Sequence, residues 1–182
     1  GNLIFNNGKP WQYNYSAEIL IPGRWDYTTS VFNFFNNTIY STASAATGPK
    51  YAVAVAQWEP MVGTPVFNFR NNIIYTGNYP AIYDPTNRLT HSDNLVYRAS
   101  GSEDEHINNG VSLNRAGVLT WEPTARNTDP AFAGGTLPTG FVGTYGVDLA
   151  PDSNFFTVSS PEALKKGAAL GSPYDGSING AG

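Results

Sequence analysis

Hydrophobic residues recur along this chain in a four-residue phrase that begins with asparagine, continues with apolar or β-branched residues and ends with an aromatic ring. The copies begin at positions 2, 37, 72 and 94, which gives two steps of 35 residues and one of 22. Each phrase predicts a β-strand, because β-branched and aromatic residues suit a pleated, half-buried surface. The residue before each phrase tolerates a positive φ and predicts a sharp bend. These residues are Gly1, Asn36, Asn71 and Asp93.

The residues ahead of the second and third phrases repeat as well. Val31–Phe35 reads VFNFF, and Val66–Arg70 reads VFNFR. Repetition at such a period predicts a solenoid, in which each repeat forms one turn stacked on the last. Equivalent strands of successive turns then run parallel, about 4.8 Å apart. Their stacked asparagines can donate to and accept from one another, which predicts an amide ladder along the stack.

With these phrases and this expected ladder, the chain resembles the right-handed parallel β-helix proteins of the pectate-lyase-like superfamily. The resemblance implies an all-β, right-handed parallel β-helix solenoid whose coils take about 22 residues when their loops are short. The 22-residue step fits a bare coil, and each 35-residue step fits a coil with an insertion. We therefore expect coils over residues 1–128, with loop insertions at about 9–29 and 41–65. Within the second insertion, the alternation in Tyr51–Ala56 predicts a strand.

The last part of the chain resembles the ending common in β-helix carbohydrate proteins. Ser160 suits a helix N-cap, Pro161 suits the first helical position and Gly167 suits the stop. Residues 129–182 are thus expected to close the same domain, with a short C-terminal capping helix of one or two turns. The motifs that match, in the family's order, are Asp129–Phe132, Asp148–Ser153, Ser160–Gly167 and Tyr174–Ala181.

The chain opens inside a phrase, at Gly1-Asn2, without a polar capping element before it. Solenoids need caps at both ends, and a bare first coil presents unpaired strand edges. We expect upstream chain or a partner to cover the first coil, and the sequence to be the C-terminal part of a longer secreted protein. The alternative is that the natural start lies close to Gly1.

Composition narrows the classes of partner. Charged residues make up 13% of the chain, below the usual quarter, and the net charge is −4. Neither half carries a polybasic patch, so no nucleic acid is expected. The chain has no cysteine, no apolar run of membrane-spanning length and no signal peptide. No metal or cofactor is implied, since the acidic run Glu103–Glu105 lacks a calcium-ligand spacing and suits a solvated loop.

The two expected insertions are rich in aromatic residues. Both leave after equivalent phrases, so they should emerge from the same edge of adjacent coils and bring their rings together. Aromatic rings on exposed loops stack on sugar faces while nearby polar groups bond the hydroxyls. The alternative is that the rings pack inward and hold the loops against the solenoid. The expected glycan-binding residues are Trp11, Tyr13, Arg24, Trp25, Tyr27 and Trp58.

The resemblance implies a bacterial protein, secreted or periplasmic, that acts on a polysaccharide or oligosaccharide as a polysaccharide lyase or glycoside hydrolase. The competing class is a non-catalytic glycan-binding or structural β-helix, such as an adhesin segment or the trunk of a phage-type spike. One fold hosts many functions, so the fold does not decide between these classes.

The sequence contains candidate groups for either reaction. A lyase needs a base and a cation beside the uronate carboxyl group, and the candidates are Lys9, Arg24, Arg70 and His91. A lone histidine at the position of His91 is more often packed or bonded to backbone than catalytic. A hydrolase needs two carboxylates flanking the scissile bond, and the candidates are Glu18, Asp26 and Glu59. None lies in a motif of a named enzyme family, so no catalytic role is assigned.

Overall fold

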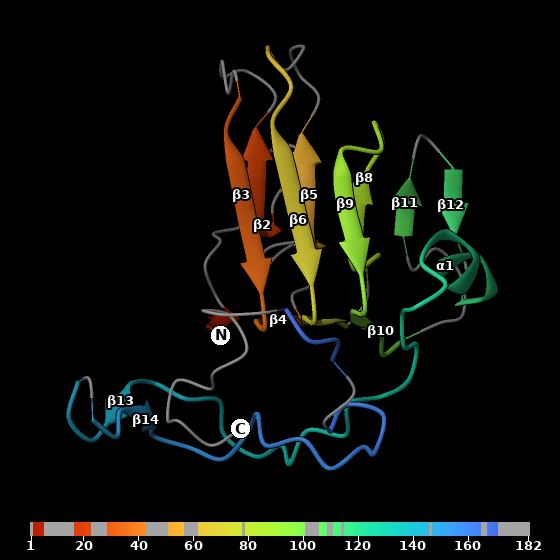
Figure 1. The fold of residues 1–182 in the computed structure, drawn as a ribbon. Helices are drawn as coiled ribbons and strands as arrows, with labels where there is room; N and C mark the ends of the chain where they lie inside the picture. The colour runs from red at the N-terminus through yellow and green to blue at the C-terminus, as the bar shows by residue number, and fades with distance from the viewer. Residues whose placement is uncertain are drawn as a thin grey trace. The chain divides into compact units, whose positions relative to one another are not determined.

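The chain divides into two compact units, Gly1–Asp129 and Pro130–Gly182, each described here by itself. The first unit contains three sheets of stacked strands, and Figure 1 shows two of them as layers one behind the other. The computed structural model describes residues 2–5, 17–22, 29–42, 51–56, 62–77, 79–100, 106–108, 111–113, 115–145, 147–164 and 167–170.

Each of the three sheets takes its strands from successive repeats of the chain. The strands of the asparagine phrases form one sheet, in the order β1 (Leu3–Phe5), β4 (Thr38–Ser41), β7 (Ile73–Thr76) and β10 (Leu95–Arg98). The second sheet has the order β3 (Val31–Phe35), β6 (Val66–Arg70) and β9 (Leu89–Ser92). The third has the order β2 (Ala17–Pro22), β5 (Tyr51–Ala56), β8 (Ile82–Asp84), β11 (His106–Asn108) and β12 (Val111–Leu113).

The strands pair in parallel, as the repeated phrases predict. Every pairing named within these three sheets is parallel except that of β11 with β12. From β3 to β11 the chain visits the three sheets in a fixed order, so each round adds one strand to each sheet. This arrangement is consistent with a parallel β-helix-like fold.

The bends before the phrases have the backbone conformation that their residues predict. The φ angle is 57° at Asn36, 56° at Asn71 and 59° at Asp93, in the left-handed region that asparagine and aspartate tolerate better than most residues. The strands that follow are in register, with Thr38 opposite both Leu3 and Ile73. Each bend therefore delivers the next phrase to the same position in the stack.

The expected amide ladder is present and consists of Asn2, Asn37, Asn72 and Asn94. Asn37 donates its backbone N–H and its Nδ2–H to Asn72 Oδ1, at 3.0 and 2.9 Å. Asn2 makes the same two bonds to Asn37 Oδ1, both at 3.0 Å, and Asn72 makes them to Asn94 Oδ1, also at 3.0 Å. The ladder therefore has a direction, because each asparagine donates to the one that follows it.

The core lies between the sheets and is made of stacked identical or similar side chains. Ile39 and Ile74 face inward from the phrases and are fully buried. Phe34 stacks on Phe69 with ring centroids 4.4 Å apart, and Phe32 stacks on Phe67 at 5.2 Å. Alternation along the strands explains the pattern, because inward and outward side chains take turns along each strand.

Strands lie inside both ranges that the sequence analysis assigns to loop insertions. The strand expected at Tyr51–Ala56 is formed as β5, and it pairs in parallel with β2, which spans Ala17–Pro22. Both strands belong to the third sheet, and Ile19 and Ile21 of β2 contribute to the core. Glu18, which is itself only 8% exposed, interrupts this apolar run, so the sequence alone does not mark it as a core strand.

The downstream end of the stack is closed in each of the three sheets. Arg126 pairs with the edge of β10, where its carbonyl accepts Val96 N–H at 2.8 Å and its N–H donates to Asn94 O at 2.8 Å. In the third sheet the antiparallel strand β12 covers β11. Helix α1 (Arg115–Trp121) ends with Trp121, whose ring stacks on that of His91 in β9.

The second unit has little regular structure in its described residues. Strands β13 (Phe141–Val142) and β14 (Ala150–Pro151) form an antiparallel pair. Where the sequence predicts a capping helix of one or two turns after Ser160, residues 160–164 form a single turn, in which the Ser160 carbonyl accepts the N–H groups of Ala163 and Leu164. Leu164 is 45% exposed. The turn thus buries little apolar surface, and short helices in water depend on such packing.

Candidate functional site

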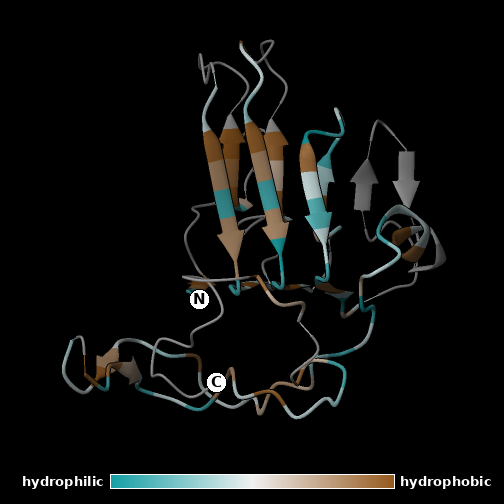
Figure 2. Ribbon diagram, viewed as in Figure 1, coloured by the Kyte–Doolittle hydropathy of each residue, from teal (hydrophilic) through white to brown (hydrophobic). Residues whose placement is uncertain are grey.

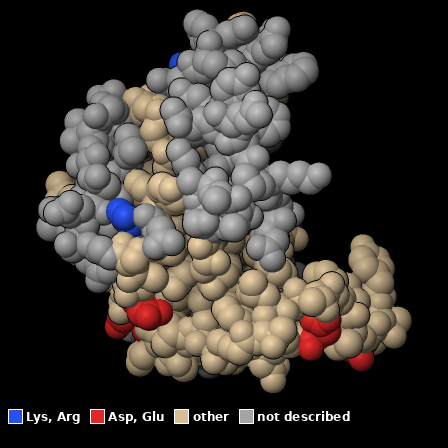
Figure 3. Space-filling model, turned by 180° about the vertical axis from the view of Figure 1, so that it is seen from behind, with Lys and Arg blue, Asp and Glu red and all other residues tan. Residues whose placement is uncertain are grey.

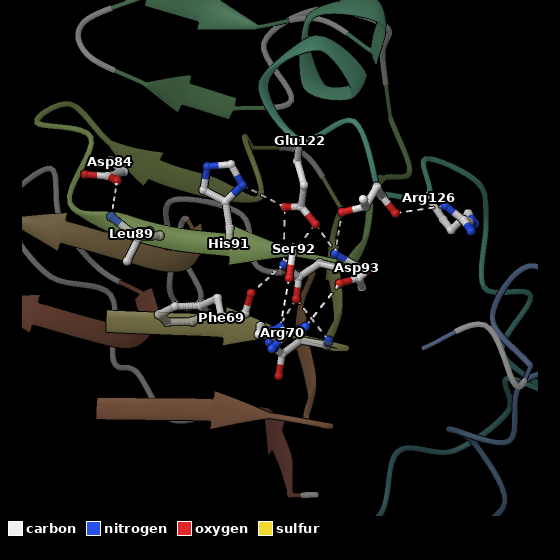
Figure 4. A network of polar contacts seen from close by, with 12 residues as sticks. Phe69, Arg70, Asp84, Leu89, His91, Ser92, Asp93, Glu122 and Arg126 are labelled. Carbon is white, nitrogen blue, oxygen red and sulfur yellow. Dashed lines mark hydrogen bonds and ion pairs between the residues drawn. The ribbon is translucent and has the colours of Figure 1, made fainter. Parts of the chain in front are cut away.

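A network of polar contacts at the downstream end of the ladder joins three segments of the first unit (Figure 4). Glu122, directly after helix α1, is 1% exposed. Its Oε1 accepts the backbone N–H of Asn94 at 2.8 Å and Asn94 Nδ2–H at 3.1 Å. These are the two donors that every other asparagine of the ladder gives to its successor. Glu122 therefore takes the position of a fifth asparagine and ends the ladder with a group that only accepts.

His91 continues the aromatic core stack rather than lining a surface. It lies in register with Phe69, and its ring stacks on Trp121 with centroids 3.5 Å apart and planes 23° apart. His91 Nδ1 lies 3.1 Å from Glu122 Oε2, and the side chain is 14% exposed. The interpretation of His91 as a packed residue is confirmed. Its polar partner is the Glu122 carboxylate, and the alternative of a bond to the backbone is not what holds it.

Arg70 belongs to the opposite face of the same sheet. Its Nε donates to Ser92 Oγ at 2.9 Å, and Nη2 lies 3.8 Å from Asp93 Oδ2. The Arg70 side chain is 38% exposed, so this long ion pair contributes little stability. Because neighbouring residues in a strand point to opposite faces, Arg70 and His91 cannot act together on one substrate.

The outer face of β3, β6 and β9 presents a regular polar row with an apolar flank on one side. Asn33 and Asn68 are in register, and Asn68 Nδ2 donates to Asn33 Oδ1 at 2.8 Å. Thr90, which is exposed, is the next residue in this row. Figure 2 shows a hydrophilic band across the middle of β3 and β6, with hydrophobic positions directly before and after it. We call this surface the amide face; it comprises Val31, Asn33, Val66, Asn68, Arg70, Thr90 and Ser92.

The amide face keeps hydrogen-bonding capacity for a ligand. Among the described residues, Asn33 Nδ2 and Asn68 Oδ1 have no partner, and Thr90 Oγ1 has none. The row thus offers donors and acceptors in sequence along the stack. Val31 and Val66, which flank it, are 59% and 40% exposed. A molecule with alternating hydroxyl groups and apolar C–H surface matches this combination.

A stack of tyrosines on the sheet of the phrases has altered acidity. Tyr40 and Tyr75 stack with centroids 4.9 Å apart, and Tyr97 follows at 5.9 Å. Burial, with smaller contributions from Tyr40, Asp129 and Tyr97, raises the pKa of Tyr75 to about 12. Burial also raises the pKa of Tyr40. Both phenols therefore stay protonated at neutral pH and cannot serve as bases.

The expected glycan-binding residues of the insertions lie outside the described residues. The same holds for four of the catalytic candidates, Lys9, Arg24, Asp26 and Glu59. Glu18, a hydrolase candidate, is buried on β2 rather than presented on a surface. The undescribed binding residues are Trp11, Tyr13, Arg24, Trp25, Tyr27 and Trp58.

The sequence analysis does not single out two groups of residues that the structure brings forward. Glu122 has no sequence signal, because it lies 28 residues after Asn94 outside any phrase. The pair Asn33 and Asn68 does have one, since both sit at the centre of the repeated VFNF motif, where period-two alternation places them opposite the phenylalanines.

Comparisons with known proteins identify no relative. No protein-family model matches the chain, and no curated protein or solved structure matches it significantly.

Among the described residues, no group of three or more His, Cys, Asp or Glu side chains could hold a metal ion. No helix in this part of the chain is long and apolar enough to cross a membrane. On the face that Figure 3 shows, the Lys and Arg atoms drawn in blue lie apart from one another.

Proposed function

We propose that this chain is a right-handed parallel β-helix solenoid from a secreted or periplasmic bacterial protein, and that it binds a polysaccharide along the amide face. The row Asn33, Asn68 and Thr90 is the observation that carries this proposal. Its free amide and hydroxyl groups repeat at the spacing of stacked strands, about 4.8 Å. An extended glycan presents hydroxyl groups repeatedly along its length, so it can bond several coils at once.

The surroundings of the row support a carbohydrate ligand. Exposed Val31 and Val66 offer apolar contact for sugar C–H groups, and Arg70 supplies one cation at the edge. The residues expected from the sequence to bind a glycan also fit such a ligand, because aromatic rings stack on sugar faces and Arg24 can bond hydroxyl groups. The aromatic members of this set are Trp11, Tyr13, Trp25, Tyr27 and Trp58.

Binding without cleavage is the form of the proposal that the described residues support best. The two described lyase candidates, Arg70 and His91, lie on opposite faces of one sheet, and His91 is committed to Trp121 and Glu122. The buried tyrosines stay protonated at neutral pH. Neither the pair Arg70 and His91 nor the buried tyrosines place a base next to a cation. A lyase needs both groups to abstract the proton beside the uronate carboxyl group.

A polysaccharide lyase or glycoside hydrolase is the second candidate. The observation in its favour is the exposed guanidinium of Arg70 on the amide face, which can pair with a uronate carboxylate. The base or the paired carboxylates would then come from Lys9, Arg24, Asp26 or Glu59.

The test is calorimetric titration with neutral and uronate-rich polysaccharides, combined with an assay for products. Replacing both Asn33 and Asn68 with alanine should weaken binding at least tenfold. Asn154→Ala, at an exposed asparagine of the second unit, is the matched control and should bind like the native chain. Equal binding by both variants contradicts a site on the amide face.

The products decide between the two candidates. Reducing ends together with ultraviolet absorbance of unsaturated sugars indicate a lyase, and reducing ends alone indicate a hydrolase. Binding without products supports the glycan-binding module. Failure to bind any polysaccharide leaves the structural β-helix of an adhesin or spike and rejects the proposed function.

A further inference from the structure

The two ends of the stack differ in how they are finished. The downstream end is closed by Glu122, Trp121, Arg126 and β12. At the upstream end, β1, β2 and β3 are each the edge strand of their sheet. A parallel strand at an edge presents backbone groups that can pair with another strand.

Side chains at the upstream end are less buried than their register partners in the next coil. Ile39 and Val53 are fully buried, whereas Ile4 and Ile19, which lie opposite them, are only partly buried. Phe67 and Phe69 are 2% and 0% exposed, whereas their partners Phe32 and Phe34 are only partly buried. The inward rows therefore reach the upstream end with apolar surface uncovered in all three sheets.

The ladder gives this end a defined chemistry. Each later asparagine accepts two hydrogen bonds on Oδ1, from the backbone N–H and the Nδ2–H of its predecessor. Asn2 is exposed, and among the described residues no donor reaches its Oδ1. In the part of the chain that the structure describes, the upstream end thus presents an unused acceptor, Asn2 Oδ1. At the downstream end, the oxygens of Glu122 are already bonded to Asn94 and His91.

This polarity excludes a second copy of the chain as the natural occupant. Head-to-tail stacking would bring Glu122 to Asn2, but that carboxylate has no donor and is already bonded to Asn94 and His91. Head-to-head stacking would reverse the strand direction, because a twofold axis relates the two ends. It would also oppose two Asn2 side chains instead of continuing the ladder.

We propose that the upstream end of the stack is a docking surface for one further parallel coil whose ladder position carries an asparagine. That coil runs in the same direction as β1, β2 and β3 and donates its asparagine N–H and Nδ2–H to Asn2 Oδ1. Its inward apolar residues cover Ile4, Ile19, Phe32 and Phe34. This inference is independent of glycan binding, because it uses the inside and the end of the stack and not the amide face.

The chain itself supplies the probe for this proposal. Residues 72–93 contain β7, β8 and β9, one strand for each sheet, and their asparagine precedes Asn94 by 22 residues. A copy of 72–93 placed directly before Asn2 sets its asparagine the same number of residues ahead of Asn2. The matched control carries Asn72→Asp in the added copy, because a carboxylate at that position cannot donate to Asn2 Oδ1.

The measurement is residue-resolved amide hydrogen exchange on the full chain with and without the added coil. The asparagine coil should slow exchange in β1 and β3 at least tenfold and raise the unfolding midpoint, while β7 and β10 report that the remaining stack is folded. The aspartate coil should give little of either effect. Light scattering on the native chain should give a monomer.

Three results would overturn the proposal. One is unchanged exchange in β1 and β3 when the asparagine coil is present and β7 and β10 remain protected. Another is equal protection by the asparagine and aspartate coils, which would remove the ladder as the recognition chemistry. The last is a native dimer whose β1 and β3 amides are already protected, which would identify a second copy as the occupant.

Discussion

Glu122 Oε1 accepts the same two hydrogen bonds from Asn94, at 2.8 and 3.1 Å, that Asn94 Oδ1 accepts from Asn72 at 3.0 Å. The carboxylate is suited to this end position, because the last member of the ladder must accept two bonds and has no successor to which it must donate. Its second oxygen is placed against His91 Nδ1. One side chain thus ends both the amide ladder and the aromatic stack.

We expect Glu122→Ala to lower the free energy of unfolding by about 2–3 kcal/mol, since it leaves buried donors of Asn94 without an acceptor. Glu122→Gln keeps one acceptor oxygen and should cost about 1 kcal/mol. Urea denaturation of the three proteins measures both values. An unfolding midpoint for the alanine variant equal to that of the native chain would show that the ladder end is not needed.

Asn72→Ala should destabilise the chain by about 1–3 kcal/mol, because Asn72 bonds both ladder neighbours and Phe34 O at 2.8 Å in a buried site. Asn68→Ala is the matched control, since the bond from Asn68 to Asn33 is exposed. Its cost should lie within about 0.5 kcal/mol. The same denaturation experiment tests the pair, and equal losses would contradict the importance of burial for the ladder.

Asn71 should tolerate glycine but not alanine. Its φ of 56° lies where a Cβ with no compensating polar group costs about 1–2 kcal/mol. Asn71→Ala should therefore lose about 1 kcal/mol, and Asn71→Gly should stay within about 0.5 kcal/mol of the native chain. Thermal or chemical unfolding gives the order of the three proteins. A glycine variant less stable than the alanine variant would remove the backbone explanation.

Tyr75 should make stability fall in alkaline solution. Its pKa is about 12 in the folded chain and 10.0 for an ordinary tyrosine, so the neutral phenol favours folding. This stabilisation is complete below pH 10.0 and is lost as the pH rises towards 12. Tyr75→Phe should therefore lose less stability over that interval than the native chain.

The matched control for this experiment is Tyr145→Phe, because Tyr145 is 89% exposed. This variant should follow the native pH profile, as measured by denaturation below pH 10.0 and again near 12. Coincident profiles for Tyr75→Phe and Tyr145→Phe would show that burial of Tyr75 does not govern the alkaline response.

The features that repeat locally could be predicted from the sequence. The phrases, the positive φ at Asn36, Asn71 and Asp93, the parallel pairing and the ladder all follow from a few residues at fixed positions. Each depends on contacts between equivalent residues, so the repeat itself carries the information. The same argument explains why the position of His91 beside Phe69 could be predicted.

The features that depend on a single, non-repeating contact could not be predicted. Helix α1 contains a glycine and β-branched residues, which are weak helix formers, and it is anchored by burial of Val118. Glu122 can take the place of an asparagine because the last member of the ladder only accepts hydrogen bonds and has no further member to which it must donate. After Ser160, where local end signals predict one or two helical turns, the chain forms a single turn that lacks a buried face, as the exposed Leu164 shows.

The unequal spacing of the ladder asparagines has a consequence for how such a chain can change. Steps of 35 and 22 residues each advance the stack by one strand, so axial rise is independent of the number of residues in a coil. Segments between the strands can lengthen or shorten without shifting any neighbouring coil. Variation in those segments can therefore alter what the surface recognises while the hydrogen-bonded interior keeps the same geometry.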